Sequence, residues 1–193
     1  MGEKLNIRFE FVACPWKRCV SMMKDGQVDL ITNFALTKER LEFSHYIMPP
    51  YAIQQTVLYV QKGNKDLIRS YPDINKSIIG TVKGAHIFER LHIDPQIQCV
   101  EVTQQTQLLE MLKNNRVSAI LGIETNLNYQ IITEGYSGMF ERAAYTPPDA
   151  YGVHFAISKH SRHNNLEPQI ERELTNLLQE GEVSRVIDNY IRE

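Results

Sequence analysis

Long hydrophobic runs and an excess of one charge are both missing from this sequence. No apolar stretch approaches the roughly 20 residues that a membrane-spanning helix needs. Lys and Arg total 21 against 23 Asp and Glu, which gives a net charge of −2. A nucleic-acid-binding protein normally carries a basic excess, so this balance argues against a nucleic-acid partner and against a strongly acidic or polybasic membrane partner. The 193 residues, 42% of them hydrophobic, suffice for one core or for two small lobes.

Cysteine is scarce, with three residues at Cys14, Cys19 and Cys99. Three cysteines exclude a complete disulfide framework. The spacing of Cys14 and Cys19 matches neither a CxxC redox pair nor the usual separation of zinc ligands. We interpret all three as small apolar residues. One disulfide in an oxidising compartment remains an alternative.

The common catalytic motifs are also missing. The sequence contains no GxSxG nucleophile elbow, no HExxH zinc motif, no Walker A loop and no GxGxxG dinucleotide motif. The six histidines are not spaced as metal ligands, and His160 and His163 lie in a polar stretch that is typical of a solvated loop. The sequence therefore predicts no catalytic residue, no metal site and no cofactor.

Two stretches of the chain repeat the same order of residue types. Residues 22–31 (MMKDGQVDLI) and 111–120 (MLKNNRVSAI) each read as the end of a helix followed by a buried strand. Gly26 and Asn115 stand where each helix should end in a left-handed conformation, which Gly and Asn tolerate best. The repeat predicts two lobes of similar construction.

Alternating strand and helix patterns predict an α/β fold with mainly parallel sheets and helices on both faces. Apolar residues alternate over 5–11, which predicts a first, half-buried strand. Further strands are predicted at 28–34, 56–61, 77–82, 98–102, 117–121 and 151–158, with helices at 16–24, 85–91, 103–113, 166–178 and 183–191. The crossings between lobes fall near 51–55 and 148–151. Lobe one would then comprise residues 1–53 and 151–193, and lobe two residues 54–150.

The segment that follows the strand at 30–34 contains the strongest candidate binding residue. Thr37 is a plausible helix N-cap, which places Arg40 at a helix start near the carboxyl end of a strand. A guanidinium there can hold a carboxylate through two parallel hydrogen bonds. The alternative is a surface arginine that pairs with Glu39 or Glu42.

Other candidates each have a structural alternative. The joint Gly84, Ala85 and His86 could present free N–H groups at a helix start to an anion, or could be a short strand-to-helix loop that needs glycine. Glu124 follows a strand and could face a cationic ligand group, or be a first-turn acid of a helix. Four aromatic residues could stack on a ligand, or belong to the core: Trp16, Phe34, Tyr46 and Tyr51.

These residues resemble a known family. Residues 23–31, then Thr37-Lys38-Glu39-Arg40, then Phe43-Ser44 are similar to the L-x-x-G-x-x-D … T-x-x-R … F-S signature of the family 3 extracellular solute-binding proteins, the polar amino-acid receptors of ABC importers. The resemblance extends over nearly the whole chain. It implies a two-lobe, type II periplasmic-binding-protein (Venus flytrap) fold, a periplasmic location, a small-molecule ligand, an ABC permease as partner and no catalysis.

The resemblance also implies roles for single residues. Arg40 matches the arginine that holds the ligand carboxylate, and Thr37 matches the threonine beside it. Ala35 and Ala85, after Gly84, stand where the family usually has hydroxyl side chains. The aspartate that usually holds the ligand ammonium falls at Ile123, with Glu124 one position on. The match at Arg40 implies a ligand that carries a carboxylate, an amino acid or a related organic anion, whereas the departures count against an α-amino acid.

The family normally has one more strand and helix before the segment at 5–11. The resemblance therefore implies that lobe one lacks its first strand, which leaves open a dimer through that lobe. Two other functions also remain open. One is a ligand-sensing module for a membrane signalling partner. The other is a dehydratase-like enzyme on the same scaffold, with Glu124 or His86 as its acid or base.

Overall fold

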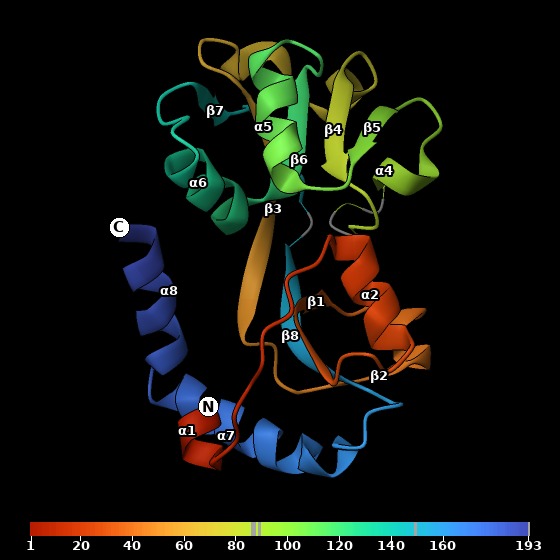
Figure 1. Ribbon diagram of the computed structural model, residues 1–193. Coiled ribbons are helices and arrows are strands. Elements are labelled where there is room, and N and C mark those ends of the chain that lie inside the picture. The colour runs from red at the N-terminus through yellow and green to blue at the C-terminus, as the bar shows by residue number, and fades with distance from the viewer. Residues whose placement is uncertain (86–87, 89, 149, 193) are drawn as a thin grey trace. The chain divides into compact units, whose positions relative to one another are not determined.

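The computed structural model describes residues 1–193 except 86–87, 89, 149 and 193 (Figure 1). Contacts divide the chain into two compact units, one of Met1–Ile53 with Tyr151–Glu193 and one of Gln54–Ala150. We call them unit 1 and unit 2. Over the described residues, no helix combines the length and the apolar character required to cross a membrane.

Unit 1 is built on strand β8 (Ala150–Ser158), which pairs antiparallel with β1 (Leu30–Ala35) and with β2 (Ser44–Tyr46). Successive residues of β8 face opposite sides of the sheet. Ala156 joins an apolar cluster with Met23, and Ile157 joins a second cluster with Ile170. Helix α2 (Trp16–Lys24) therefore covers one face and α7 (Glu167–Gln179) covers the other. The remaining elements of unit 1 are α1 (Gly2–Leu5), η1 (Arg40–Glu42), η3 (Asn164–Leu166) and α8 (Glu182–Arg192).

Unit 2 is a mixed sheet with the strand order β7-β3-β6-β4-β5. Strand β4 (Ile78–Val82) is parallel to β5 (Gln98–Val102) and to β6 (Ala119–Ile123), whereas β3 (Ala52–Gln61) is antiparallel to β6 and to β7 (Phe140–Arg142). Helices α5 (Gln105–Lys113) and α6 (Glu124–Thr133) bury leucines and isoleucines against it. The remaining elements of unit 2 are η2 (Lys65–Leu67), α3 (Tyr71–Ile74) and α4 (Arg90–Ile93).

The α/β class is confirmed, but the expectation of mainly parallel sheets is wrong for the described strand pairs. The parallel pairs among them are those of β4 with β5 and of β4 with β6. Parallel pairing needs a crossover of a dozen or more residues, and the connections that contain α4 and α5 provide it. Strands β3 and β8 are instead antiparallel to the neighbours described for them, so both units contain antiparallel pairs.

The strand predicted at residues 5–11 is also wrong. Helix α1 takes up the chain to Leu5, Asn6 adopts a left-handed conformation, and no described residue from 6 to 15 lies in a helix or a strand. The alternation of burial survives as far as Phe9, but Phe11 is 92% exposed. Alternation alone cannot supply a neighbouring strand, and without a hydrogen-bonded neighbour the segment is not a strand.

The disulfide that the sequence left as an alternative is present. Cys14 is bonded to Cys19, so the interpretation of these two as small apolar residues is wrong. Cys99 is free and exposed. A short spacing that fits no redox or metal motif can still be closed when a turn brings the two Cα atoms together, here to 5.6 Å.

Both predicted left-handed helix ends are confirmed. Gly26 has a φ of 69° after α2, and Asn115 has a φ of 55° after α5. In each case the N–H of the next residue bonds back to a helix carbonyl, from Gln27 to Met22 and from Arg116 to Met111. The two joints therefore share one C-terminal capping geometry.

Replacing Gly26 by alanine should destabilise unit 1 more than an alanine at Gly181. Both glycines have nearly the same φ, 69° and 71°, where a side chain costs roughly 1–2 kcal/mol. A Cβ at Gly26 would lie 2.7 Å from the His160 Cβ, whereas nothing lies within 4 Å of one at Gly181. We expect a further loss of about 1–3 kcal/mol in Gly26→Ala. Urea unfolding of both variants measures the difference, and equal losses would contradict the clash.

Candidate functional site

The end of strand β1 positions the candidate arginine. The strand stops at the buried Ala35, and the Thr37 Oγ1 accepts a hydrogen bond of 3.2 Å from the Arg40 N–H. The N-cap of the turn that follows is Glu39, so the prediction of Thr37 as the N-cap is wrong, although its hydroxyl oxygen does bond to the backbone of Arg40. The turn is a single one of 3-10 helix, Arg40–Glu42, rather than the α-helix that the sequence suggested.

The guanidinium of Arg40 is buried. The residue is 3% exposed, which rules out the alternative of a surface arginine. Its Nη1 donates a hydrogen bond of 2.8 Å to the Ala35 carbonyl. Its Cζ lies 4.4 Å from the centre of the Phe34 ring and 5.7 Å from that of Trp16. These cation–π contacts and the carbonyl engage the cation through neutral groups.

Burial sets the electrostatics of this guanidinium. Desolvation lowers the pKa of Arg40, although the side chain of arginine stays protonated at any physiological pH. Attraction by the charge of Glu39 and a hydrogen bond with the Tyr46 side chain act in the opposite direction. A carboxylate brought to this group would form charge-assisted hydrogen bonds in a setting of low dielectric constant. The arrangement is therefore suited to holding a small anion.

Two tyrosines that the sequence did not single out as carboxylate contacts complete this part of unit 1. The Tyr46 hydroxyl donates to the Ala35 carbonyl at 2.9 Å, and burial raises the pKa of Tyr46 to about 12. Burial also raises the pKa of Tyr151, with the charge of Arg40 acting in the opposite direction. The Tyr151 hydroxyl oxygen is buried and has no hydrogen-bond partner among the described residues. The sequence offered little reason to place these tyrosines in a binding site, because aromatic residues in strands usually belong to the hydrophobic core.

The structure brings together five residues of unit 1 that the sequence predicted as ligand-binding residues. Trp16 and Phe34 pack with their ring centres 6.1 Å apart, so both belong to the apolar cluster under α2 while also facing the guanidinium. These two rings are therefore part of the hydrophobic core and also contact the candidate binding residue Arg40. The residues of this group, which we call the Arg40 cluster, are Trp16, Phe34, Ala35, Thr37, Arg40, Tyr46 and Tyr151.

Of the helix start predicted at 84–86, the described residues Gly84 and Ala85 are not part of a helix. Gly84 lies in a turn with a φ of 78°, and the Ala85 N–H is already bonded to the Val82 carbonyl at 3.1 Å. His86 lies outside the described residues. Helix α4 begins only at Arg90 and has four residues. The loop alternative describes Gly84 and Ala85 better than an anion-binding helix start does.

Glu124 is occupied by an ion pair. It is the first residue of α6, as the alternative reading had it, and its Oε1 accepts a hydrogen bond of 2.6 Å from Arg142. Ile123 precedes it as the N-cap. Because Arg142 compensates the carboxylate, Glu124 is poorly placed to hold a ligand ammonium or to act as a general base.

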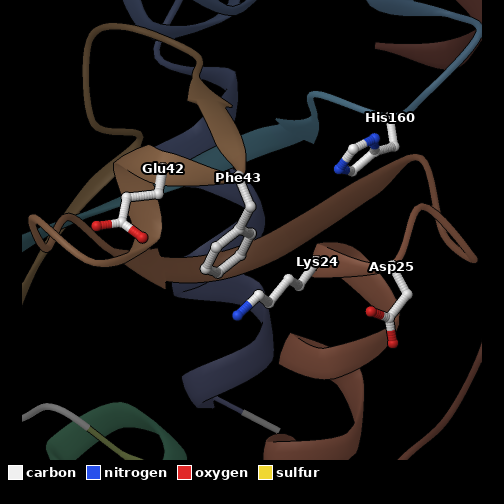
Figure 2. A pocket seen from close by; sticks show the side chains of 5 residues that line it. All are labelled: Lys24, Asp25, Glu42, Phe43 and His160. Carbon is white, nitrogen blue, oxygen red and sulfur yellow. The ribbon is translucent and has the colours of Figure 1, made fainter.

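Unit 1 also contains an open pocket of about 490 Å³, lined by Lys24, Asp25, Glu42, Phe43 and His160 (Figure 2). None of the predicted site residues lines it. Figure 2 shows the Lys24 amino group and the Asp25 carboxylate pointing away from each other. Among the residues that the structure describes, no group of three or more His, Cys, Asp or Glu is arranged to hold a metal ion. The pocket therefore offers mixed charges without a convergent set of ligands.

Comparisons with known proteins identify the family of this chain. The family model of the bacterial extracellular solute-binding proteins, family 3, matches residues 1–193. A probable amino-acid-binding protein, YxeM of Bacillus subtilis, is 25% identical over 197 residues, covering 100% of this chain and 73% of the relative.

Solved structures share the fold. The amino acid ABC transporter substrate-binding protein AbpA of Streptococcus pneumoniae, bound to L-arginine, has a TM-score of 0.85 at 18% identity, covering 99% of this chain and 79% of its own. The GluR0 ligand-binding core of Nostoc punctiforme, in complex with L-glutamate, has a TM-score of 0.82 at 19% identity, covering 100% and 87%. These likenesses confirm a type II periplasmic-binding-protein fold, and the full-length match to the family model places this chain among the family 3 extracellular solute-binding proteins of bacteria.

Proposed function

We propose that this chain is the periplasmic receptor of an ABC importer and captures a small ligand that carries a carboxylate, an amino acid or a related organic anion. The observation that carries this proposal is the guanidinium of Arg40, which lies buried after the end of β1 in contact with the Phe34 ring and the Ala35 carbonyl. The buried Tyr151 hydroxyl supplies a second donor in the same cluster. The names of YxeM and AbpA support the amino-acid and ABC-transporter parts of the proposal.

The rest of the ligand is less constrained by these residues. Ala35 and Ala85 have no hydroxyl to offer a carboxylate, Ile123 is apolar, and Glu124 is paired with Arg142. These features favour a ligand whose recognition depends on its carboxylate more than on an α-ammonium group. They also weaken the dehydratase alternative, because Glu124 was one of its two candidate acids. Three further points remain predictions: an ABC permease as partner, a role as a ligand-sensing module, and a dimer formed through lobe one.

A thermal-shift experiment on the wild-type protein tests the carboxylate. L-Arginine, L-glutamate and succinate would each be compared with the matching carboxamide, in which the negative charge is removed. A ligand at one hundred times its Kd stabilises by about 2.7 kcal/mol, which at about 2–4 °C per kcal/mol predicts a rise in Tm of roughly 5–10 °C. We expect this rise for at least one acid and not for its amide. Equal rises for acid and amide would contradict a carboxylate anchor.

A further inference from the structure

Trp16 has an unusual position for the one tryptophan of the chain. It is the first residue of α2, where a helix end frays most easily, and yet its ring lies against both Phe34 and the Arg40 guanidinium. The preceding Pro15 is the N-cap and has no side-chain cap hydrogen bond. The local sequence alone therefore gives the first turn of α2 little support.

The segment that leads into α2 gives little support either. Within the described part of unit 1, the turn hydrogen bonds at the N-terminus end with the Ile7 N–H to Gly2, and the next is donated by Arg18 to Pro15. Between them the chain has no regular structure, and Phe11 and Val12 are 92% and 57% exposed. Such a segment opens at low free-energy cost.

The Cys14–Cys19 disulfide links this irregular segment to the start of α2. Cys14 precedes the helix, and Cys19 lies three residues after Trp16 on α2 and packs against the same apolar cluster as Phe34. The bond therefore ties the irregular segment to the first turn of the helix, with Pro15 and Trp16 inside a short covalent ring. A cross-link of this kind removes the frayed conformations of the residues that it encloses.

We propose that the Cys14–Cys19 disulfide is a positioning device, which holds Trp16 against Phe34 and Arg40 and so keeps the guanidinium ready for a carboxylate. The inference rests on the proposed function for its effect on affinity, but not for its effect on Trp16. Without the bond, the first turn of α2 opens, the indole moves into water, and Arg40 loses its contact with the Trp16 ring.

Fluorescence of the single tryptophan tests the positioning without any ligand. The double variant Cys14→Ser/Cys19→Ser would be compared with Cys99→Ser, which removes the exposed free cysteine. We expect a red-shifted emission maximum and an acrylamide quenching constant at least twofold higher in the double variant only, with the far-UV circular dichroism of both variants unchanged. Emission and quenching that match those of the wild type would overturn the proposal.

Calorimetric titration with L-arginine, L-glutamate and succinate tests the consequence for affinity. We expect 5- to 20-fold weaker binding in the double variant and in Trp16→Ala, and binding within about threefold of the wild type in Trp16→Phe. A double variant with displaced Trp16 and unchanged affinity would overturn the link to the anion site. If the wild-type protein binds none of the three probes, the carboxylate function fails, and the fluorescence result alone decides whether the disulfide positions Trp16.

Discussion

Replacing Arg40 by methionine is expected to abolish carboxylate binding without unfolding the protein. Removing one partner of a buried, hydrogen-bonded charge pair costs about 2–5 kcal/mol of binding free energy. At about 1.4 kcal/mol per factor of ten, this corresponds to a loss of roughly 30-fold to several thousand-fold in affinity. Calorimetric titration with the acid that gives the largest thermal shift in the wild-type protein measures it.

The fold should tolerate this change because the Ala35 carbonyl, which loses its hydrogen bond from Arg40, keeps a second donor. The Ala35 carbonyl still accepts a hydrogen bond from the Tyr46 hydroxyl. Methionine is unbranched and apolar, so it can fill the space between rings while removing the cost of a buried charge. We expect the Tm of the unliganded variant to equal or exceed that of the wild type. Arg172→Met, at an exposed position of α7, is the matched control for losing one arginine. Carboxylate affinity retained in Arg40→Met would remove Arg40 from the proposed site.

Among the substitutions considered for this protein, Phe34→Ala should lower the free energy of unfolding the most. The ring is 0% exposed and packs with its centre 5.5 Å from that of Tyr46 and 6.4 Å from that of Phe43. Phenylalanine-to-alanine changes in cores cost about 3–5 kcal/mol. At about 2–4 °C per kcal/mol, the expected fall in Tm is roughly 6–20 °C. Urea unfolding and thermal melting both measure it.

A second phenylalanine of unit 1 is the control for this prediction. Phe11 is 92% exposed, and surface changes are usually within about 0.5 kcal/mol. Phe11→Ala should therefore melt as the wild type does. Hydrogen exchange should locate the damage of Phe34→Ala in α2 and β1, with β6 of unit 2 protected. A uniform loss of protection in both units would show that Phe34 supports more than its own cluster.

The features that the sequence predicted well depend on neighbours along the chain. Gly26 and Asn115 end helices because the left-handed conformation follows from residue type and position. The arginine at position 40 could be picked out because its placement after a strand is itself a local pattern.

The features that the sequence missed depend on contacts between distant residues. Alternation at 5–11 predicted a strand, but pairing requires a neighbour that the pattern does not contain. Glu124 looked available until the fold placed Arg142 beside it, 18 residues later. Tyr151 is more than 100 residues from Arg40 in the chain, and only the packing of β8 beside β1 brings the two into electrostatic range.

The register of β1 against β8 shifts between Ile31 and Phe34, where Asn33 has a φ of 56° and its N–H donates a hydrogen bond to the Tyr51 hydroxyl oxygen. In a regular strand, residues three apart point to opposite faces. Here Ile31 and Phe34 both face α2, because the bulge adds one residue and reverses the alternation. The spacing between Ile31 and Phe34 is thus part of the site. A regular strand of the same length would turn the Phe34 ring to the face opposite Ile31 and take this aromatic surface away from Arg40, so the bulge itself sets the direction of the ring.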